Sequence, residues 1–307
     1  MDVYPLLTHD RIAERLALPS SPIDVVMDTD TFNEIDDQFA VTYALLSPNL
    51  NVRALYAAPF FNANSSSPAD GMERSYQEIL RLLDRLGHPA DGLVFRGSTG
   101  YLPAKLTPVH SPAAEDLIAK ALAHQGAPLY VLSIGCITNV ASALLMEPRI
   151  ADKIVIVWLG GNPTYWDHTR EFNLMQDVPA AQVVFDSGVP LVQIPCINVA
   201  EHLRTTLPEI ERYVRGRGAI GDYLYETFRN CSQDHFGYSR VIWDISTVAF
   251  MNNPEWVPTR LEPSPVLLDD ITWGSTDPAR HPVRMAYHIN RDAIFRDLFT
   301  KLAQNAG

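Results

Sequence analysis

Five short apolar runs alternate with segments of helical periodicity along the first two thirds of the chain. Each run is nearly continuous in hydrophobicity, which is typical of parallel strands covered on both faces. The runs lie at residues 23–28, 52–58, 128–134, 153–159 and 190–195. The segments of helical periodicity between them cover residues 36–46, 72–86, 112–123, 138–146 and 179–185. This alternation predicts an α/β fold with an open, mostly parallel sheet flanked by helices.

The pattern changes after about residue 198, where helical periodicity dominates. We expect helices at 208–228 and 240–251, then a proline-rich stretch at 254–282 and a last amphipathic helix near 292–303. Neither a low-complexity linker nor an internal repeat interrupts the chain. The sequence therefore predicts one domain over residues 1–307, in which residues 199–307 form a helix-rich elaboration.

Composition and charge limit the classes of partner. The chain has 307 residues, a formal net charge of −12 and no apolar run near the roughly 20 residues of a membrane span, so neither nucleic acid nor a membrane is an expected partner. The three cysteines, Cys136, Cys196 and Cys231, lack a CxxC pair, and the first twenty residues lack a signal-peptide core. We therefore expect a cytoplasmic protein.

An acidic cluster follows the first predicted strand, where ligands bind in open α/β sheets. Its members are Asp28, Asp30, Glu34, Asp36 and Asp37, and no lysine or arginine occurs at residues 16–52. Carboxylates this close raise one another's pKa unless a cation compensates, and oxygen ligands favour Ca²⁺ or Mg²⁺ over zinc. For Asp36 and Asp37 an alternative is a favourable interaction with the positive N-terminus of the next helix.

The cluster resembles the DxDxxxDD motif that nucleoside hydrolases of the inosine-uridine preferring kind carry after their first strand. Here the segment is DTDTFNEIDD, in which Asn33 and Glu34 lengthen the metal loop by two residues. Further landmarks of that family follow in the expected order: GCITN with Gly135, Thr138 and Asn139, the pair Gly160 and Gly161, EFN with Glu171 and Asn173, then Asp177 and a late Asp244. The chain is identified as a divergent member of that family.

The resemblance implies Ca²⁺-dependent hydrolysis of the N-glycosidic bond of a ribonucleoside or related N-riboside, releasing base and ribose. The ion ligands it implies are Asp30, Asp37, the backbone carbonyl of Thr138, and Asp244, with Asp30 also acting as the general base. It further implies that substrate is bound by Asp36, Glu171 and Asn173, with Asp28 orienting its neighbours from behind. A homo-oligomer, dimer or tetramer, is also implied.

Two departures from the family pattern bear on the substrate. A VAGN-like stretch is replaced by YAAPFFNANSSSPADG, where Asn62 or Asn64 substitutes for the missing asparagine or the segment is a polar loop. Trp243 stands where many members have a histidine that protonates the leaving base. An indole stacks on a base but is no useful acid. Either another group protonates the base, with His235, His168 and Tyr238 as candidates, or the leaving group needs little help.

Other interpretations stay open from the residues alone. Asp244 is also a candidate helix N-cap, and Thr138 and Asn139 are candidate caps of the helix at 138–146. Another metal-dependent hydrolase, such as a phosphohydrolase, also places aspartates at a strand end, although it needs nearby cations that residues 16–52 lack. The last alternative is a catalytically silent descendant that binds ribosides or Ca²⁺.

Overall fold

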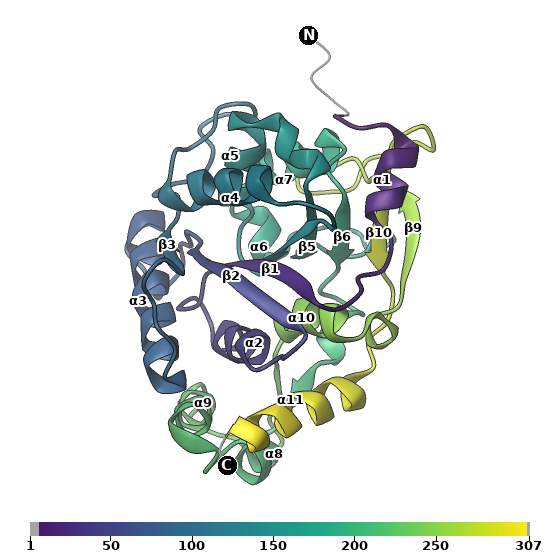
Figure 1. Cartoon of the computed structure of the whole chain (residues 1–307). Coiled ribbons are helices and arrows are strands. Elements are labelled where there is room, and N and C mark those ends of the chain that lie inside the picture. Colours follow the sequence, from purple (N-terminus) through teal and green to yellow (C-terminus); the bar gives the residue numbers. More distant parts are fainter. Residues whose placement is uncertain (1–5, 306–307) are drawn as a thin grey trace.

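A twisted eight-stranded sheet forms the centre of the computed structural model, which describes residues 6–305 (Figure 1). The first five residues of the N-terminal stretch discussed above and the last two residues lie outside that range. The strand order is β3-β2-β1-β4-β5-β6-β10-β9. The strands are β1 Ile23–Thr29, β2 Leu50–Ala57, β3 Val94–Arg96, β4 Leu129–Ser133, β5 Ile154–Leu159, β6 Leu191–Ile194, β9 Thr259–Pro263 and β10 Pro282–Ala286. Neighbouring strands run parallel, except that β9 is antiparallel to β10.

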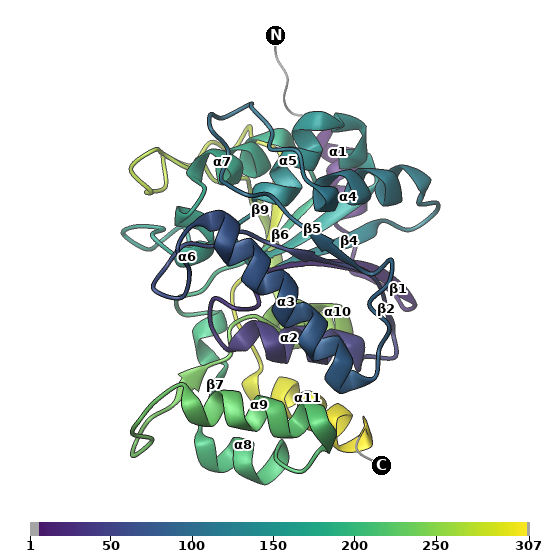
Figure 2. The same ribbon diagram turned by 90° about the vertical axis from the view of Figure 1, so that its left-hand side faces the viewer.

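Helices cover both faces of the sheet, as the continuous apolar runs predict. Every residue of β4 and β5 is buried. One face carries α4 Pro112–Ala123, α5 Thr138–Met146 and α7 Val178–Ser187, and the other carries α2 Asp36–Leu45 and α10 Ile245–Asn252, while α3 Pro68–Leu86 lies at the β3 edge (Figures 1 and 2). The α/β fold with a mostly parallel sheet is therefore confirmed.

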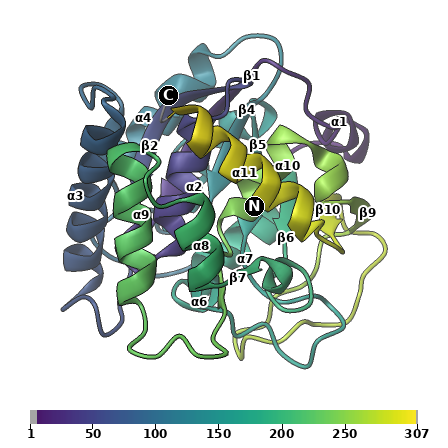
Figure 3. The same cartoon turned by 90° about the horizontal axis from the view of Figure 1, so that it is seen from below.

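A further helical layer lies outside α2 and α10. It consists of α8 Leu207–Tyr213, α9 Gly218–Asn230 and α11 Arg291–Asn305, which lie in front of those two helices when the molecule is seen from below (Figure 3). The remaining short elements are α1 His9–Arg15, α6 Phe172–Met175, β7 Arg204–Thr205 and β8 Arg240–Val241. Within residues 6–305 there is no helix with the length and apolar character that crossing a membrane requires.

The C-terminal part differs from the helix-rich prediction in three places. The helix expected at 208–228 is divided into α8 and α9 by a turn in which Gly216 and Gly218 both have positive φ. The helix expected at 240–251 starts only at Ile245, because its first residues form β8. Residues 199–307 also contribute β9 and β10 to the main sheet, and Arg284 in β10 donates to the Leu16 carbonyl at 2.8 Å. Charged side chains of this kind hide a strand from a hydrophobicity pattern.

The connectivity determines where a ligand binds. From β1 the chain proceeds through β2 and β3 on one side, and it then returns to β4 on the other side of β1. Ligands bind outside the carboxyl ends of the strands at such a switch point. Residues directly after β1 and β4 are therefore the centre of the candidate site.

Candidate active site

Asp28, near the carboxyl end of β1, is held behind the site. Its Oδ1 accepts a hydrogen bond from Asn139 Nδ2 at 2.8 Å and its Oδ2 one from Ser133 Oγ at 3.4 Å. The Oδ1 of Asn139 in turn accepts from the Ser98 N–H at 2.7 Å. Burial raises the pKa of Asp28 to about 7. Asn139 and Ser133 thus fix the Asp28 carboxylate, which does not line the cavity.

Asp30 presents an unpartnered carboxylate to a cavity of about 300 Å³ at the switch point. Both of its side-chain oxygens are buried and neither has a hydrogen-bond partner. Burial, together with the charges of Asp37 and Asp36, raises the pKa of Asp30 well above its usual value. A buried carboxylate without donors is costly to ionise, so this position favours a cation beside it.

The first turn of α2 places Asp36 and Asp37 beside Asp30. Asp37 Oδ1 accepts from Thr29 Oγ1 at 2.5 Å, and Asp36 Oδ2 accepts from the Trp243 N–H at 3.2 Å. Burial raises the pKa of Asp36 to about 7 and that of Asp37 well above the usual value. Both residues do occupy the helix N-terminus, as the alternative interpretation has it, and both also line the cavity.

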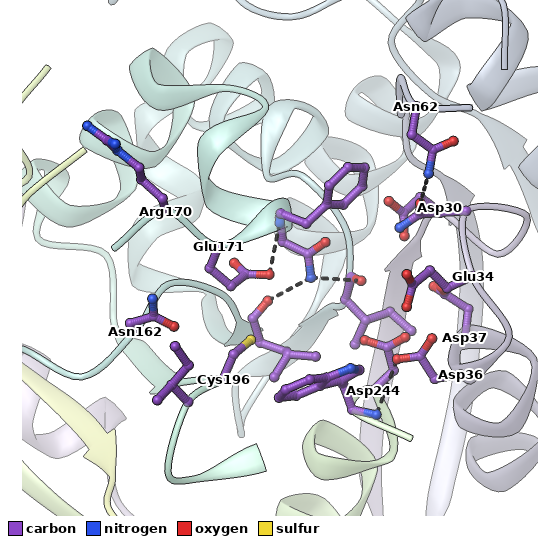
Figure 4. Close-up of a pocket in the computed structure, with 17 residues that line it drawn as sticks. Asp30, Glu34, Asp36, Asp37, Asn62, Asn162, Arg170, Glu171, Cys196 and Asp244 are labelled. Atoms are coloured by element: carbon purple, nitrogen blue, oxygen red, sulfur yellow. Dashed lines mark hydrogen bonds between the residues drawn. The ribbon is translucent and has the colours of Figure 1, made fainter. Parts of the chain in front are cut away.

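Asp244, from the C-terminal part of the chain, lies beside Asp36 and Asp37. It precedes α10 at the N-cap position, yet its side chain makes no capping hydrogen bond. Instead, one carboxylate oxygen from each of Asp36, Asp37 and Asp244 lies within 4.8 Å of the others, an arrangement that could hold a metal ion. Figure 4 shows these carboxylates together with Asp30 on one side of the cavity. This three-residue group contains Asp36, which the resemblance assigns to the sugar.

The structure does not bring Thr138, which the resemblance implies as an ion ligand, to the cavity. Its hydroxyl donates to Asp177 Oδ2 at 2.6 Å, and it does not line the cavity. As the first residue of α5 its carbonyl points along the helix, away from the strand ends. Neither Thr138 nor Asn139 caps α5, whose N-cap residue Ile137 makes no side-chain bond. The residue that follows β4 and lines the cavity is Ile134.

The opposite wall is built around the EFN segment. The Glu171 carboxylate accepts hydrogen bonds from the backbone N–H groups of Gly161 at 2.8 Å, Asn173 at 2.9 Å and Leu174 at 3.1 Å. Burial nevertheless raises the pKa of Glu171. Asn173 Nδ2 donates to the carbonyls of Ile134 at 3.2 Å and Leu159 at 3.0 Å. Both residues line the cavity, and Figure 4 shows Glu171 across from the aspartates.

Gly161 has a backbone role in this wall. Its φ is +72°, and a Cβ atom there would lie 2.7 Å from Thr169 Oγ1. Both features require glycine at this position. The absence of a side chain lets the Gly161 N–H approach the Glu171 carboxylate.

The candidate acids for the leaving group do not line the cavity. His235 Nε2 lies 2.9 Å from the Arg229 carbonyl oxygen, and its ring stacks on Phe228. His168 Nδ1 accepts from the Arg170 N–H at 3.3 Å. Neither histidine nor Tyr238 is among the cavity-lining residues, whereas Trp243 is. The structure therefore brings the tryptophan to the site and leaves these three groups outside it.

Several lining residues escape sequence-based reasoning. The inserted residues Asn33 and Glu34 line the cavity. So does Asn62, one of the two asparagines considered as substitutes for the family's asparagine. Residues not singled out from the sequence complete the lining: Ile134, Leu159, Asn162, Arg170, Phe172, Cys196 and Ile197. Ile134 directly follows β4, while Asn162 and Cys196 lie three and two residues after the ends of β5 and β6. Their place after predicted strands is the signal that could have identified them.

Comparisons with known proteins agree on one family. The family model described as inosine-uridine preferring nucleoside hydrolase matches residues 25–296. The chain is similar to the pyrimidine-specific ribonucleoside hydrolase RihA of Salmonella paratyphi A, with 31% identity over 272 residues, 78% of this chain and 81% of the relative.

Solved structures show the same fold. A plant nucleoside hydrolase has a TM-score of 0.72 at 21% identity, covering 92% of this chain and 99% of that structure. The inosine-uridine preferring nucleoside hydrolase of Bacillus anthracis has a TM-score of 0.70 at 18% identity and the same coverage. The chain therefore belongs to the inosine-uridine preferring nucleoside hydrolase family and is an enzyme that hydrolyses N-glycosyl compounds.

Proposed function

We propose that this enzyme uses Ca²⁺ to hydrolyse the N-glycosidic bond of a ribonucleoside or closely related N-riboside, releasing base and ribose. The observation that carries the proposal is the buried Asp36, Asp37 and Asp244 group beside the unpartnered Asp30 carboxylate, all facing Glu171 and Asn173 across one cavity. A cavity of about 300 Å³ is within the range of small-ligand sites.

The donor set supports Ca²⁺ as the ion. We propose Asp30, Asp37 and Asp244 as its carboxylate ligands: Asp37 and Asp244 belong to the buried group that could hold an ion, and Asp30 lines the same cavity. We further propose that the backbone carbonyl of Ile134 supplies the oxygen expected from Thr138. An oxygen-only set with several carboxylates favours Ca²⁺ over softer metals. When bound, the ion supplies positive charge that acidifies the attacking water and orients the ribose hydroxyls.

We assign each step of the hydrolysis to a residue that lines the cavity. Asp30 accepts the proton of the attacking water, because its free oxygens have no other partner. Asp36 binds ribose hydroxyls, while Glu171 and Asn173 hold the opposite side of the sugar. The cationic, oxocarbenium-like sugar of the transition state is stabilised by the surrounding carboxylates. Asp30 thus positions the water, while Glu171 and Asn173 position the sugar on the opposite side of the N-glycosidic bond.

Trp243 is proposed to stack on the leaving base. It lines the cavity and is partly buried, and its backbone N–H donates to Asp36. We expect Trp243→Ala to raise KM by about tenfold through lost aromatic contact, and Trp243→Phe to retain most of the affinity. Steady-state kinetics on the preferred nucleoside measures both. Equal KM values for Trp243→Ala and the wild type would contradict the proposal that Trp243 stacks on the base.

A substrate panel tests the function itself. Purified protein with Ca²⁺ is incubated with uridine, cytidine, inosine, adenosine and guanosine, and free base and reducing sugar are quantified. The relatives named pyrimidine-specific make uridine and cytidine the first to test. We expect equimolar base and ribose from at least one of them. Saturable binding of a riboside without any turnover would instead establish the catalytically silent alternative.

We also propose a cytoplasmic homo-oligomer, dimer or tetramer. The three cysteines are free thiols in the structure, which suits a reducing compartment. The oligomer rests on the family resemblance alone. Light scattering of the purified protein measures the mass in solution, to be compared with the 34.2 kDa of one chain.

A further inference from the structure

Asn33, the first of the two residues that lengthen the metal loop, bonds to a segment that precedes α3. Asn33 Oδ1 accepts from Asn62 Nδ2 at 2.5 Å, and the Asn33 carbonyl accepts from Asn64 Nδ2 at 2.8 Å. The N–H of Asn33 donates to the Asp30 carbonyl at 2.6 Å. One inserted residue therefore ties residues 59–67, which we name rim segment 1, to the backbone of the proposed general base.

The other inserted residue bonds to a segment from the far end of the chain. Glu34 Oε2 accepts from Arg240 Nη2 at 2.7 Å, with the Glu34 and Arg240 side chains 47% and 23% exposed. Arg240 ends residues 231–240, which we name rim segment 2, and pairs with Thr205 in the small β7–β8 sheet. Arg240 Nε is buried and has no hydrogen-bond partner. The ion pair with Glu34 is thus a principal polar anchor of this guanidinium.

Besides this ion pair, rim segment 2 contacts α9 through His235, which lies against the Arg229 carbonyl and the Phe228 ring. Its residues between α9 and β8 form no helix or strand, and Phe236 at its tip is 96% exposed. Loops with few buried contacts open locally at low free energy. Three residues beyond Arg240, Trp243 forms part of the cavity wall. Displacement of Arg240 would therefore move the wall against which we place the base.

We propose that Asn33 and Glu34 form a clasp that ties rim segments 1 and 2 to the metal loop, and that the Glu34–Arg240 pair controls substrate affinity rather than the chemical step. Both inserted residues and Asn62 line the cavity, so the clasp is part of the substrate-facing surface. Glu34 and Arg240 are positioning residues, because they act through the wall and not on the scissile bond. The kinetic part of this inference rests on the proposed function.

A double-mutant cycle tests the clasp on the full chain loaded with Ca²⁺. The variants are Glu34→Gln, Arg240→Gln, the double variant, and the exchanged pair Glu34→Arg with Arg240→Glu. Amide hydrogen exchange of residues 231–239 reports the loop, and steady-state kinetics reports KM and kcat. The matched control is Glu211→Gln, which breaks the exposed 2.8 Å pair between Glu211 on α8 and Arg215 in the turn that follows.

We expect each single variant to speed exchange of residues 231–239 and to raise KM by about threefold to fivefold, the range of a partly exposed ion pair. The double variant should be no worse than either single one, because both remove the same contact. The exchanged pair should recover part of the protection, while kcat and Ca²⁺ affinity stay within about twofold. Glu211→Gln should match the wild type in every readout.

The outcomes separate this inference from the proposed function. If the wild type cleaves no nucleoside, the proposed function fails, and the exchange data alone still decide whether the clasp exists. Unchanged exchange of residues 231–239 in both Glu34→Gln and Arg240→Gln overturns the clasp, whatever the activity. If the KM effects of the two single variants multiply in the double variant, Glu34 and Arg240 do not act as a pair. If the variants lower only kcat, the pair does not control substrate affinity.

Discussion

An Asp30→Asn enzyme loses turnover by about a thousandfold while its ion-free form becomes more stable than the wild type. The loss follows from removing the proposed general base, a change that costs about 10²- to 10⁴-fold. The gain in stability follows because the wild-type carboxylate is buried without a hydrogen-bond partner. Steady-state kinetics with Ca²⁺ and thermal melting in a chelator measure the two effects. A misfolded variant would lose both turnover and stability, so a loss of turnover together with a gain in stability cannot arise from misfolding.

Asp116→Asn is the matched control for that experiment. Asp116 is a partly buried carboxylate on α4 that accepts from Tyr56 at 2.7 Å and pairs with Lys120 at 2.6 Å. Because this carboxylate is paired and does not line the cavity, its amide variant should keep kcat and lose stability. Turnover of Asp30→Asn within about tenfold of the wild type would contradict its assignment as the base.

Removal of Ca²⁺ should abolish turnover and make stability strongly dependent on pH. In the ion-free protein burial raises the pKa of Asp28 and Asp36 from 3.8 to about 7, and the pKa values of Asp30, Asp37 and Asp244 are also raised. A group with a raised folded-state pKa stabilises the fold fully below its unfolded pKa. That contribution is lost as the pH rises through the folded pKa, here from about 4 to 7 and above.

Thermal melting at pH 5 to 8, in chelator and in Ca²⁺, measures this dependence. We expect the melting temperature in chelator to fall by about 10 °C over that range, since each pKa unit corresponds to about 1.4 kcal/mol. Bound Ca²⁺ should flatten the curve, because its charge compensates the ionised cluster. Asp37→Asn should weaken both the Ca²⁺ stabilisation and the pH slope. Parallel curves with and without Ca²⁺ would argue against an ion in this cluster.

Five of the parallel strands, β1, β2, β4, β5 and β6, could be predicted because their signal is local. Runs such as residues 153–159 are apolar throughout, and only burial on both faces accommodates that pattern. Strands β3, β9 and β10 escaped prediction. Strand β3 has two partly exposed residues and one exposed residue, β9 lies at the sheet edge, and β10 contains Arg284, whose charge is satisfied by the Leu16 carbonyl. That compensation comes from a residue 268 positions away.

The sequence by itself determined the α/β class, the position of the acidic cluster after a buried strand, and the order of the family landmarks. These features depend on residue periodicity and on short spacings, which are properties of neighbouring residues. Only the tertiary structure decided that Asp244 meets Asp36 and Asp37, that Thr138 turns to Asp177, and that His235 lies outside the cavity. Sheet register and helix packing bring distant side chains together or apart, and no local pattern encodes that convergence.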